Sequence, residues 1–120
     1  MITHDFKDGK GPIPAHRHTN GGGWVADSAY VADTAYVGKN AQVYDYACVF
    51  DRARVFGYAR VFGNAQVSGN AQVYGYAHVN EYAHVADYAQ VYGSAYVSGN
   101  AVVYGNARVY SNTLVGYKTL

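Results

Sequence analysis

The histidines are the residues of this chain best suited to acid–base or metal chemistry. His78 and His84 lie six positions apart, and an imidazole can act as a general base near neutral pH. His16 and His18 form a His-x-His pair, and a neutral imidazole is a common metal ligand. No further ligands can be assigned to that pair from the sequence, so we expect no metal site and no cofactor. We assign no catalytic residue, because His78 and His84 occupy positions that elsewhere hold Gln, Arg or Tyr.

Aromatic residues recur at intervals of eighteen positions, at Phe56, Tyr74, Tyr92 and Tyr110. Rings aligned in this way can stack within the chain, or they can form a platform for a ligand. A long apolar strip on a surface is also typical of an interface, which is the interpretation we favour. The candidate interface or binding residues are this row and its neighbours: Phe56, Tyr58, Tyr74, Tyr76, Tyr92, Tyr96, Tyr110, His78 and Arg60.

Arginines form one cluster with aromatic residues, made of Arg52, Arg54 and Arg60 with Phe50 and Phe56. Such a mixture can bind single-stranded nucleic acid by stacking and charge. Aspartates nearby would cancel much of that charge, and the formal net charge of the chain is only +1. We therefore do not expect a nucleic-acid partner.

The elements that position these residues follow from a strict six-residue repeat. Valine occupies every sixth position from Val25 to Val115, sixteen in all, and alanine precedes each by two positions from Ala29 to Ala107. A period of six fits neither a helix face nor plain strand alternation, whereas short exact repeats are typical of solenoids. The residue two after each valine is mostly Gly or Asp, which accept left-handed backbone angles. Each repeat therefore predicts a short strand, with Ala and Val pointing inward, that ends in a corner.

At the motifs Asn64-Ala65-Gln66-Val67 and Asn70-Ala71-Gln72-Val73, the chain resembles the hexapeptide-repeat, left-handed parallel β-helix family. The resemblance covers residues 24–120 and implies an all-β, single-domain triangular β-solenoid. It also implies eighteen residues per coil and five to six coils. Left-handedness comes from the resemblance alone. Residues 1–23 contain both prolines and a Gly21-Gly22-Gly23 run, and we expect an irregular N-terminal cap there, with Trp24 leading onto the first coil.

The same resemblance brings in two functions that remain open as alternatives. Some members of the family are acyltransferases that use a histidine at a trimer interface. Their usual loop excursion and C-terminal extension have no counterpart here, so we expect a non-catalytic protein. If the protein is an enzyme, an acyltransferase is the expected class. Other β-helix proteins form polymers, and the larger apolar residues of 113–120 would allow end-to-end contact.

The expected function is that of an oligomeric binding or interaction module. Short phage and bacterial hexapeptide-repeat proteins share the lead from Ala15 to Trp24, and this resemblance implies an inhibitor of a host protein as one role. Trimers are the family's habit, so we expect a trimer, with a dimer second. The sequence contains no apolar block of the length of a membrane span or of a signal peptide, which predicts a cytoplasmic protein, in the host cytoplasm if phage-encoded.

Overall fold

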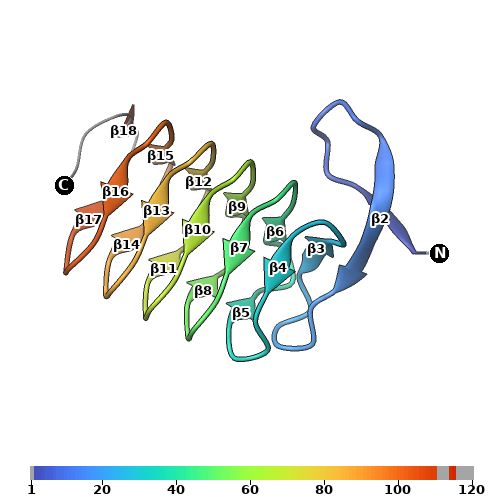
Figure 1. Ribbon diagram of the computed structural model, residues 1–120, viewed down its shortest axis with the longest axis horizontal. Coiled ribbons are helices and arrows are strands. Elements are labelled where there is room, and N and C mark those ends of the chain that lie inside the picture. The colour runs from blue at the N-terminus through green and yellow to red at the C-terminus, as the bar shows by residue number, and fades with distance from the viewer. Residues whose placement is uncertain (1, 111–113, 116–120) are drawn as a thin grey trace.

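The computed structural model describes residues 2–110 and the strand 114–115, and the described part is built from short strands arranged as a solenoid (Figure 1). Parallel strands lie in three sheets, and successive strands pass from one sheet to the next. Each coil therefore uses eighteen residues, as in the pairs Gln42↔Arg60 and Gln66↔His84. The expected all-β solenoid with eighteen-residue coils and about five turns is confirmed.

Sheet I, as we name it, includes the strands of the N-terminal segment and carries the candidate functional site. It contains, in spatial order, β1 (Thr3–Asp5), β2 (Pro12–Arg17), β3 (Trp24–Ala26), β6 (Gln42–Val43), β9 (Arg60–Val61), β12 (His78–Val79), β15 (Tyr96–Val97) and β18 (Leu114–Val115).

Sheets II and III hold five strands each. Sheet II consists of β4 (Tyr30–Val31), β7 (Cys48–Val49), β10 (Gln66–Val67), β13 (His84–Val85) and β16 (Val102–Val103). Sheet III consists of β5 (Tyr36–Val37), β8 (Arg54–Val55), β11 (Gln72–Val73), β14 (Gln90–Val91) and β17 (Arg108–Val109).

The core is a set of columns of valine and alanine inside the solenoid. Every repeat valine from Val37 to Val103 and every repeat alanine from Ala35 to Ala101 is fully buried. Small and medium side chains fit this narrow interior, which explains why larger aliphatic residues are rare in the sequence.

Corners separate the strands, and at most corners the residue two after the repeat valine has a left-handed backbone. Gly63 has a φ of 66° and Asp45, one coil earlier at the same corner, has a φ of 58°. Gly, Asp and Asn tolerate this region best, which explains the residue types at this position. The three rows of corners are named here by the sheets that they join: I–II, II–III and III–I.

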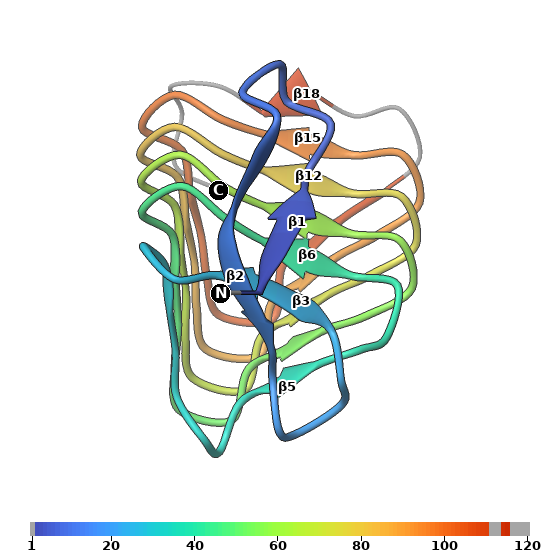
Figure 2. The same cartoon turned by 90° about the vertical axis from the view of Figure 1, so that its right-hand side faces the viewer.

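The N-terminal segment is more regular than the sequence indicates, because β1 and β2 form an antiparallel hairpin that extends sheet I through β3. The hairpin lies at the N-terminal end of the solenoid (Figure 2). Pro12 and Pro14 lie within β2, where the β1 pairing tolerates residues without an N–H donor. The expectation of an irregular cap over residues 1–23 is therefore wrong for these two strands.

Aromatic packing joins the hairpin to the coils. Phe6 is fully buried and stacks on Tyr44, with 4.8 Å between ring centroids, and Tyr44 stacks in turn on Phe62 at 4.9 Å.

Within the described residues no helix is long and apolar enough to span a membrane. The larger apolar residues of 113–120, proposed above for end-to-end contact, lie outside the described residues apart from the backbone of β18.

Candidate functional site: a groove on sheet I

Four outward side chains stand in a column on the outer face of sheet I. The parallel register aligns Trp24 with Gln42, Gln42 with Arg60, and Arg60 with His78. Because every strand ends in a corner of the same length, this column is held in place by the backbone of the solenoid. The column forms the floor of a groove.

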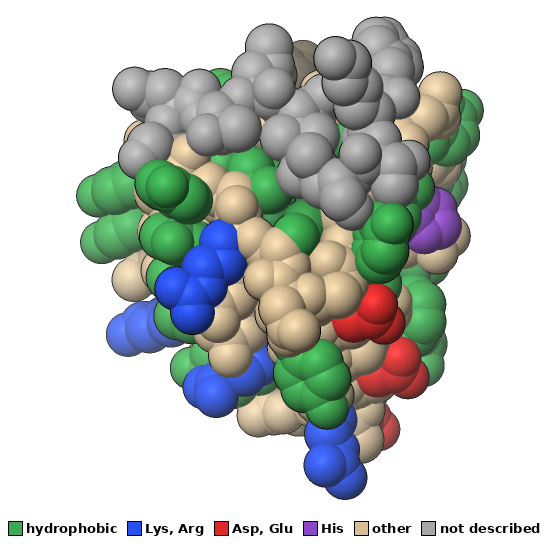
Figure 3. All heavy atoms as spheres, turned by 90° about the vertical axis from the view of Figure 1, so that its left-hand side faces the viewer, with side chains coloured by type: hydrophobic (Ala, Val, Ile, Leu, Met, Phe, Trp, Pro, Cys, Tyr) green, Lys and Arg blue, Asp and Glu red, His purple; other side chains and the backbone are tan. Residues whose placement is uncertain are grey.

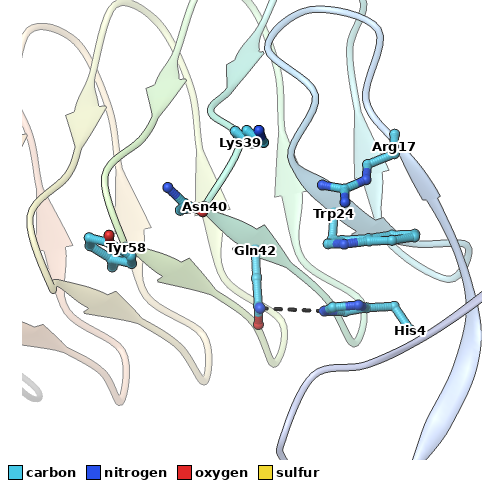
Figure 4. Close-up of a pocket in the computed structure, with 7 residues that line it drawn as sticks. All are labelled: His4, Arg17, Trp24, Lys39, Asn40, Gln42 and Tyr58. Atoms are coloured by element: carbon cyan, nitrogen blue, oxygen red, sulfur yellow. Dashed lines mark hydrogen bonds between the residues drawn. The ribbon is translucent and has the colours of Figure 1, made fainter.

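The two sides of the groove come from distant parts of the sequence. His4 and Arg17 belong to the N-terminal hairpin, while Lys39, Asn40 and Tyr58 belong to the III–I corners (Figure 4). Two adjoining hollows of about 340 and 310 Å³ share Asn40, Gln42 and Tyr58, so they form one continuous surface. We call this surface the sheet I groove; its lining is His4, Arg17, Trp24, Lys39, Asn40, Gln42, Tyr58, Arg60, Tyr76 and His78.

Trp24 is held between two side chains of the hairpin. The Arg17 guanidinium lies 4.2 Å from the Trp24 ring centroid, and the His4 ring stacks on the indole at 4.4 Å with an interplanar angle of 13°. Cation–π and stacking contacts of this kind contribute roughly 0.5–2 kcal/mol each. Trp24 therefore anchors the hairpin and does not offer a free face to a ligand.

Arg60 ties the hairpin loop to the floor. Its Nη1 donates to the carbonyl oxygen of Phe6 at 2.7 Å and to the Tyr44 hydroxyl at 3.4 Å. Burial raises the pKa of Tyr44, and the hydrogen bond from Arg60 opposes that rise. A guanidinium has five N–H donors, so Arg60 keeps donors for a ligand.

The two groove histidines favour the neutral form. Burial lowers the pKa of His78, and the Arg60 guanidinium lowers it further. Burial also lowers the pKa of His4, with Arg17 as the next largest cause and Asp5 opposing. The groove therefore takes its charge at neutral pH from Arg17, Lys39 and Arg60.

Gln42 lies at the centre of the groove floor. Its Nε2 atom is 3.4 Å from Nε2 of His4, and its Oε1 atom is buried with no hydrogen-bond partner in the described structure. A buried acceptor without a partner costs roughly 1–3 kcal/mol. The Gln42 amide oxygen is thus an unsatisfied acceptor beneath the groove surface.

No carboxylate lines the sheet I groove, and the sequence explains why. All six acidic residues of the repeats lie at the I–II and II–III corners: Asp27, Asp45 and Glu81 at the first, and Asp33, Asp51 and Asp87 at the second. Seen from the C-terminal end, Lys and Arg side chains lie to the left and below, whereas Asp and Glu lie on the right (Figure 3). The III–I corners therefore adjoin the groove without adding negative charge.

The acidic residues have a structural role at their corners. The Asp45 carboxylate accepts from the Gly63 N–H at 3.0 Å, one coil further on. Three other carboxylates repeat this bond across eighteen residues: Asp51 to Gly69, Glu81 to Gly99 and Asp87 to Gly105. These charge-assisted hydrogen bonds add to backbone hydrogen bonds at the same corners, such as the one from the Tyr46 N–H to the Gly63 carbonyl oxygen at 2.9 Å.

At the III–I corners stacked rings, not carboxylates, add to the backbone hydrogen bonds between coils, such as the one from the Tyr58 N–H to the Gly75 carbonyl oxygen at 2.8 Å. Phe56, Tyr74 and Tyr92 stack at 4.8 and 5.0 Å, and Tyr110 follows at 5.5 Å. We call this row the aromatic ladder. Stacking within the chain, one of the alternatives raised by the sequence, is therefore present. The rings from Phe56 to Tyr92 are half-buried, and Tyr110 is 51% exposed.

The predicted site residues divide into two groups. Tyr58, Arg60, Tyr76 and His78 line the sheet I groove, whereas the ladder serves the coil stacking. Tyr96 is exposed and follows His78 in the same column. Sequence reasoning missed His4, Arg17, Trp24, Lys39, Asn40 and Gln42 as groove residues. The eighteen-residue spacing of Trp24, Gln42, Arg60 and His78 was the signal that could have found the floor.

The other histidines have separate environments. His16 Nδ1 lies 2.7 Å from an Asp27 carboxylate oxygen, while His18 is buried with Nε2 2.8 Å from the Ala35 carbonyl oxygen. The His-x-His pair therefore points to two different partners. In the described ranges, no three or more His, Cys, Asp or Glu side chains form a group that could hold a metal ion. His84 lies exposed on sheet II, away from His78 on sheet I.

Comparison with known proteins agrees with this architecture. Residues 59–75, 65–81, 89–105 and 103–117 each match the family model described as the YdcK β-solenoid repeat. Neither the curated proteins nor the solved structures compared with the chain gave a match. The chain is thus a β-solenoid of about five turns, and residues 59–81 and 89–117 are similar to repeats of the YdcK type.

Proposed function

We propose that the protein is a non-catalytic binding module that recognises another protein through the sheet I groove. The observation that carries the proposal is the groove itself: ten side chains from the hairpin, the floor and the III–I corners converge on one surface. A rigid solenoid presents such a surface without a large ordering cost on binding, which favours recognition.

The environment of His78 supports binding over catalysis. Its ring makes edge contacts with Phe62 and Tyr96, at 6.0 and 4.7 Å between centroids. A general base works best with a pKa near the operating pH and an orienting acceptor. Arg60 and burial lower the pKa of His78 instead, and the groove lining offers it no carboxylate.

The identity of the partner follows only from the resemblance. If the chain is phage-encoded, the partner would be a host protein that the module inhibits. The groove would then block a surface of that protein.

Site-specific photocrosslinking tests the binding function. A benzoylphenylalanine at Tyr58 lies in the groove, and the same residue at Tyr88, an exposed corner tyrosine on the II–III row, is the matched control. We expect a discrete adduct with a partner protein at position 58, confirmed with that partner purified, and none at position 88. Adducts of equal yield at both positions, or none at position 58, would contradict the proposal.

Self-association is a separate part of the proposed function. Tyr58 and Tyr76 stack on each other at 5.3 Å and are 55% and 64% exposed, which leaves apolar surface on which a second copy would compete with the partner for the groove. We expect light scattering to give a trimer or dimer of the 13.0 kDa chain, and the double variant Tyr58→Lys, Tyr76→Lys to give a lower mass. A 13.0 kDa species for the unmodified protein would contradict this part alone.

A further inference from the structure

We infer that the sheet I groove binds an extended acidic segment of a protein chain. This inference rests on the proposed function, because it names the chemistry of the partner that the groove takes.

Charge complementarity is the first argument. Arg17, Lys39 and Arg60 line the groove, and no carboxylate does. Among the described residues Lys39 forms no ion pair, and it is exposed at the III–I corner. Arg17 uses one guanidinium nitrogen on the Gly22 carbonyl oxygen at 3.0 Å and keeps further donors. Guanidinium and ammonium groups in this arrangement favour carboxylates.

The length of the groove fits a short stretch of extended chain. The floor runs over four coils from Trp24 to His78, that is three steps of about 4.8 Å or roughly 14 Å. An extended peptide rises about 3.4 Å per residue, so about four residues would lie along the floor. One or two acidic side chains in that stretch can reach the three cations.

The amides of the groove suit a peptide backbone. Asn40 and Gln42 line the same groove as the cations, and each side-chain amide can donate and accept hydrogen bonds. The buried, unpaired Oε1 atom of Gln42 would gain a donor from a backbone N–H of the ligand only if the side chain turned it toward the groove. Tyr58 and Tyr76 add exposed rings against which ligand side chains can pack.

A nucleic acid fits the same groove less well. Binding of single strands combines many phosphate contacts with free aromatic faces. Here both faces of Trp24 are covered by Arg17 and His4, and only three cations line the groove. The net charge of +1 also gives no general attraction to a polyanion.

Fluorescence anisotropy with defined probes tests the inference. The probes are fluorescein-labelled octaglutamate, octalysine and octathymidylate at about 50 and 300 mM NaCl. The variant is Lys39→Glu, and the matched control is Arg52→Glu, the same charge change at an exposed II–III corner. Circular dichroism melting checks that both variants fold.

We expect saturable binding of octaglutamate that weakens with salt, and no binding of octalysine. Lys39→Glu should weaken octaglutamate binding by about tenfold or more, while Arg52→Glu should change it by less than about threefold. No saturable binding of octaglutamate, or equal losses in both variants, would overturn the inference. Tighter binding of octathymidylate with the same dependence on Lys39 would also overturn it, in favour of a nucleic acid. Crosslinking of a partner at position 58 through a segment without acidic residues would overturn the inference and leave the binding function standing.

Discussion

The III–I corners differ from the two other rows of corners in the side chains that add to the backbone hydrogen bonds between coils, although one ring pair, Tyr44 and Phe62, also stacks at I–II. At I–II and II–III, carboxylates accept hydrogen bonds from glycine N–H groups one coil away, as Asp45 does from Gly63 and Asp87 from Gly105. At III–I, the residue two after each valine is Lys39 in the first corner and glycine at 57, 75 and 93 in the next ones. None of these residues has a carboxylate. The aromatic ladder joins the coils there.

The difference determines where charge remains on the surface. Carboxylates used for coil stacking make two edges of the solenoid acidic, while stacked rings leave the third edge without negative charge. Arg60 and Lys39 lie beside that third edge with no carboxylate in the groove. The charge of the proposed binding surface thus depends on which side chains one row of corners carries.

The largest effect should come from a break in the aromatic ladder. Tyr74 stacks on both Phe56 and Tyr92, and its hydroxyl donates to Gln90 Oε1 at 3.2 Å. Tyr74→Ala removes these contacts from a half-buried site and should lower the free energy of unfolding by about 2 kcal/mol. Urea denaturation measures the change. Tyr88→Ala, at an exposed II–III corner, is the control and should cost less than about 0.5 kcal/mol. Equal losses would mean that the ladder does not stabilise the coils.

A smaller effect is expected at an acidic corner. Asp45→Asn keeps the shape and the tolerance for a left-handed backbone, but it removes the charge that holds the Gly63 N–H and the Lys10 ammonium. We expect a loss of about 1 kcal/mol in unfolding free energy, measured by urea titration. Asp33→Asn should be nearly neutral, because among the described residues the Asp33 carboxylate makes no such bond to the next coil. A neutral Asp45→Asn would show that the carboxylates do not join the coils.

The pH dependence of stability should report on the groove. The pKa of His78 is lowered in the folded protein by burial and Arg60, so the unfolded chain takes up a proton first as pH falls. The stability that depends on neutral His78 is therefore fully present above the pKa of about 6.5 in the unfolded chain. It is lost as the pH falls through the lower pKa of the folded protein. Urea midpoints at about pH 7.5 and 5 should differ less in His78→Gln than in the unmodified protein. An unchanged difference would mean that His78 is not held neutral.

The smallest effect on stability is expected at Lys39, the cation on which the test of the proposed binding relies. Lys39 is exposed and forms no ion pair among the described residues, so Lys39→Glu should change the unfolding free energy by less than about 0.5 kcal/mol. Thermal melting checks this. A loss above about 2 kcal/mol would show that Lys39 supports the fold at the III–I corner, which would contradict the idea that this cation is left over for a ligand.

The sequence predicts the solenoid well because its core repeats without interruption. Val67 and Ala65 sit in the same environment as Val85 and Ala83 one coil on, so a single period defines both. The ladder was predictable for the same reason, since its rings recur every eighteen residues. The hand of the solenoid could not be predicted from the repeat, because a left-handed and a right-handed solenoid have the same periodicity. Only the family resemblance implied a left hand.

The hairpin side of the groove could not be predicted from the repeat. Its position depends on contacts across long stretches of chain, such as Arg60 to the Phe6 carbonyl oxygen, 54 residues away. The prolines of β2 also obscured the strand, since they are usually taken as loop signals. The floor residue Gln42 carries no mark in its own repeat, because Gln occupies the same position in several others.

The most direct test of the difference between the edges is chemical-shift mapping of ¹⁵N-labelled protein titrated with octaglutamate. The account predicts that amide shifts concentrate at Lys39, Asn40, Gln42 and Tyr58, with none of similar size at the acidic corners around Asp51 and Asp87. Shifts spread evenly over the three rows of corners, or strongest at the acidic corners, would contradict it.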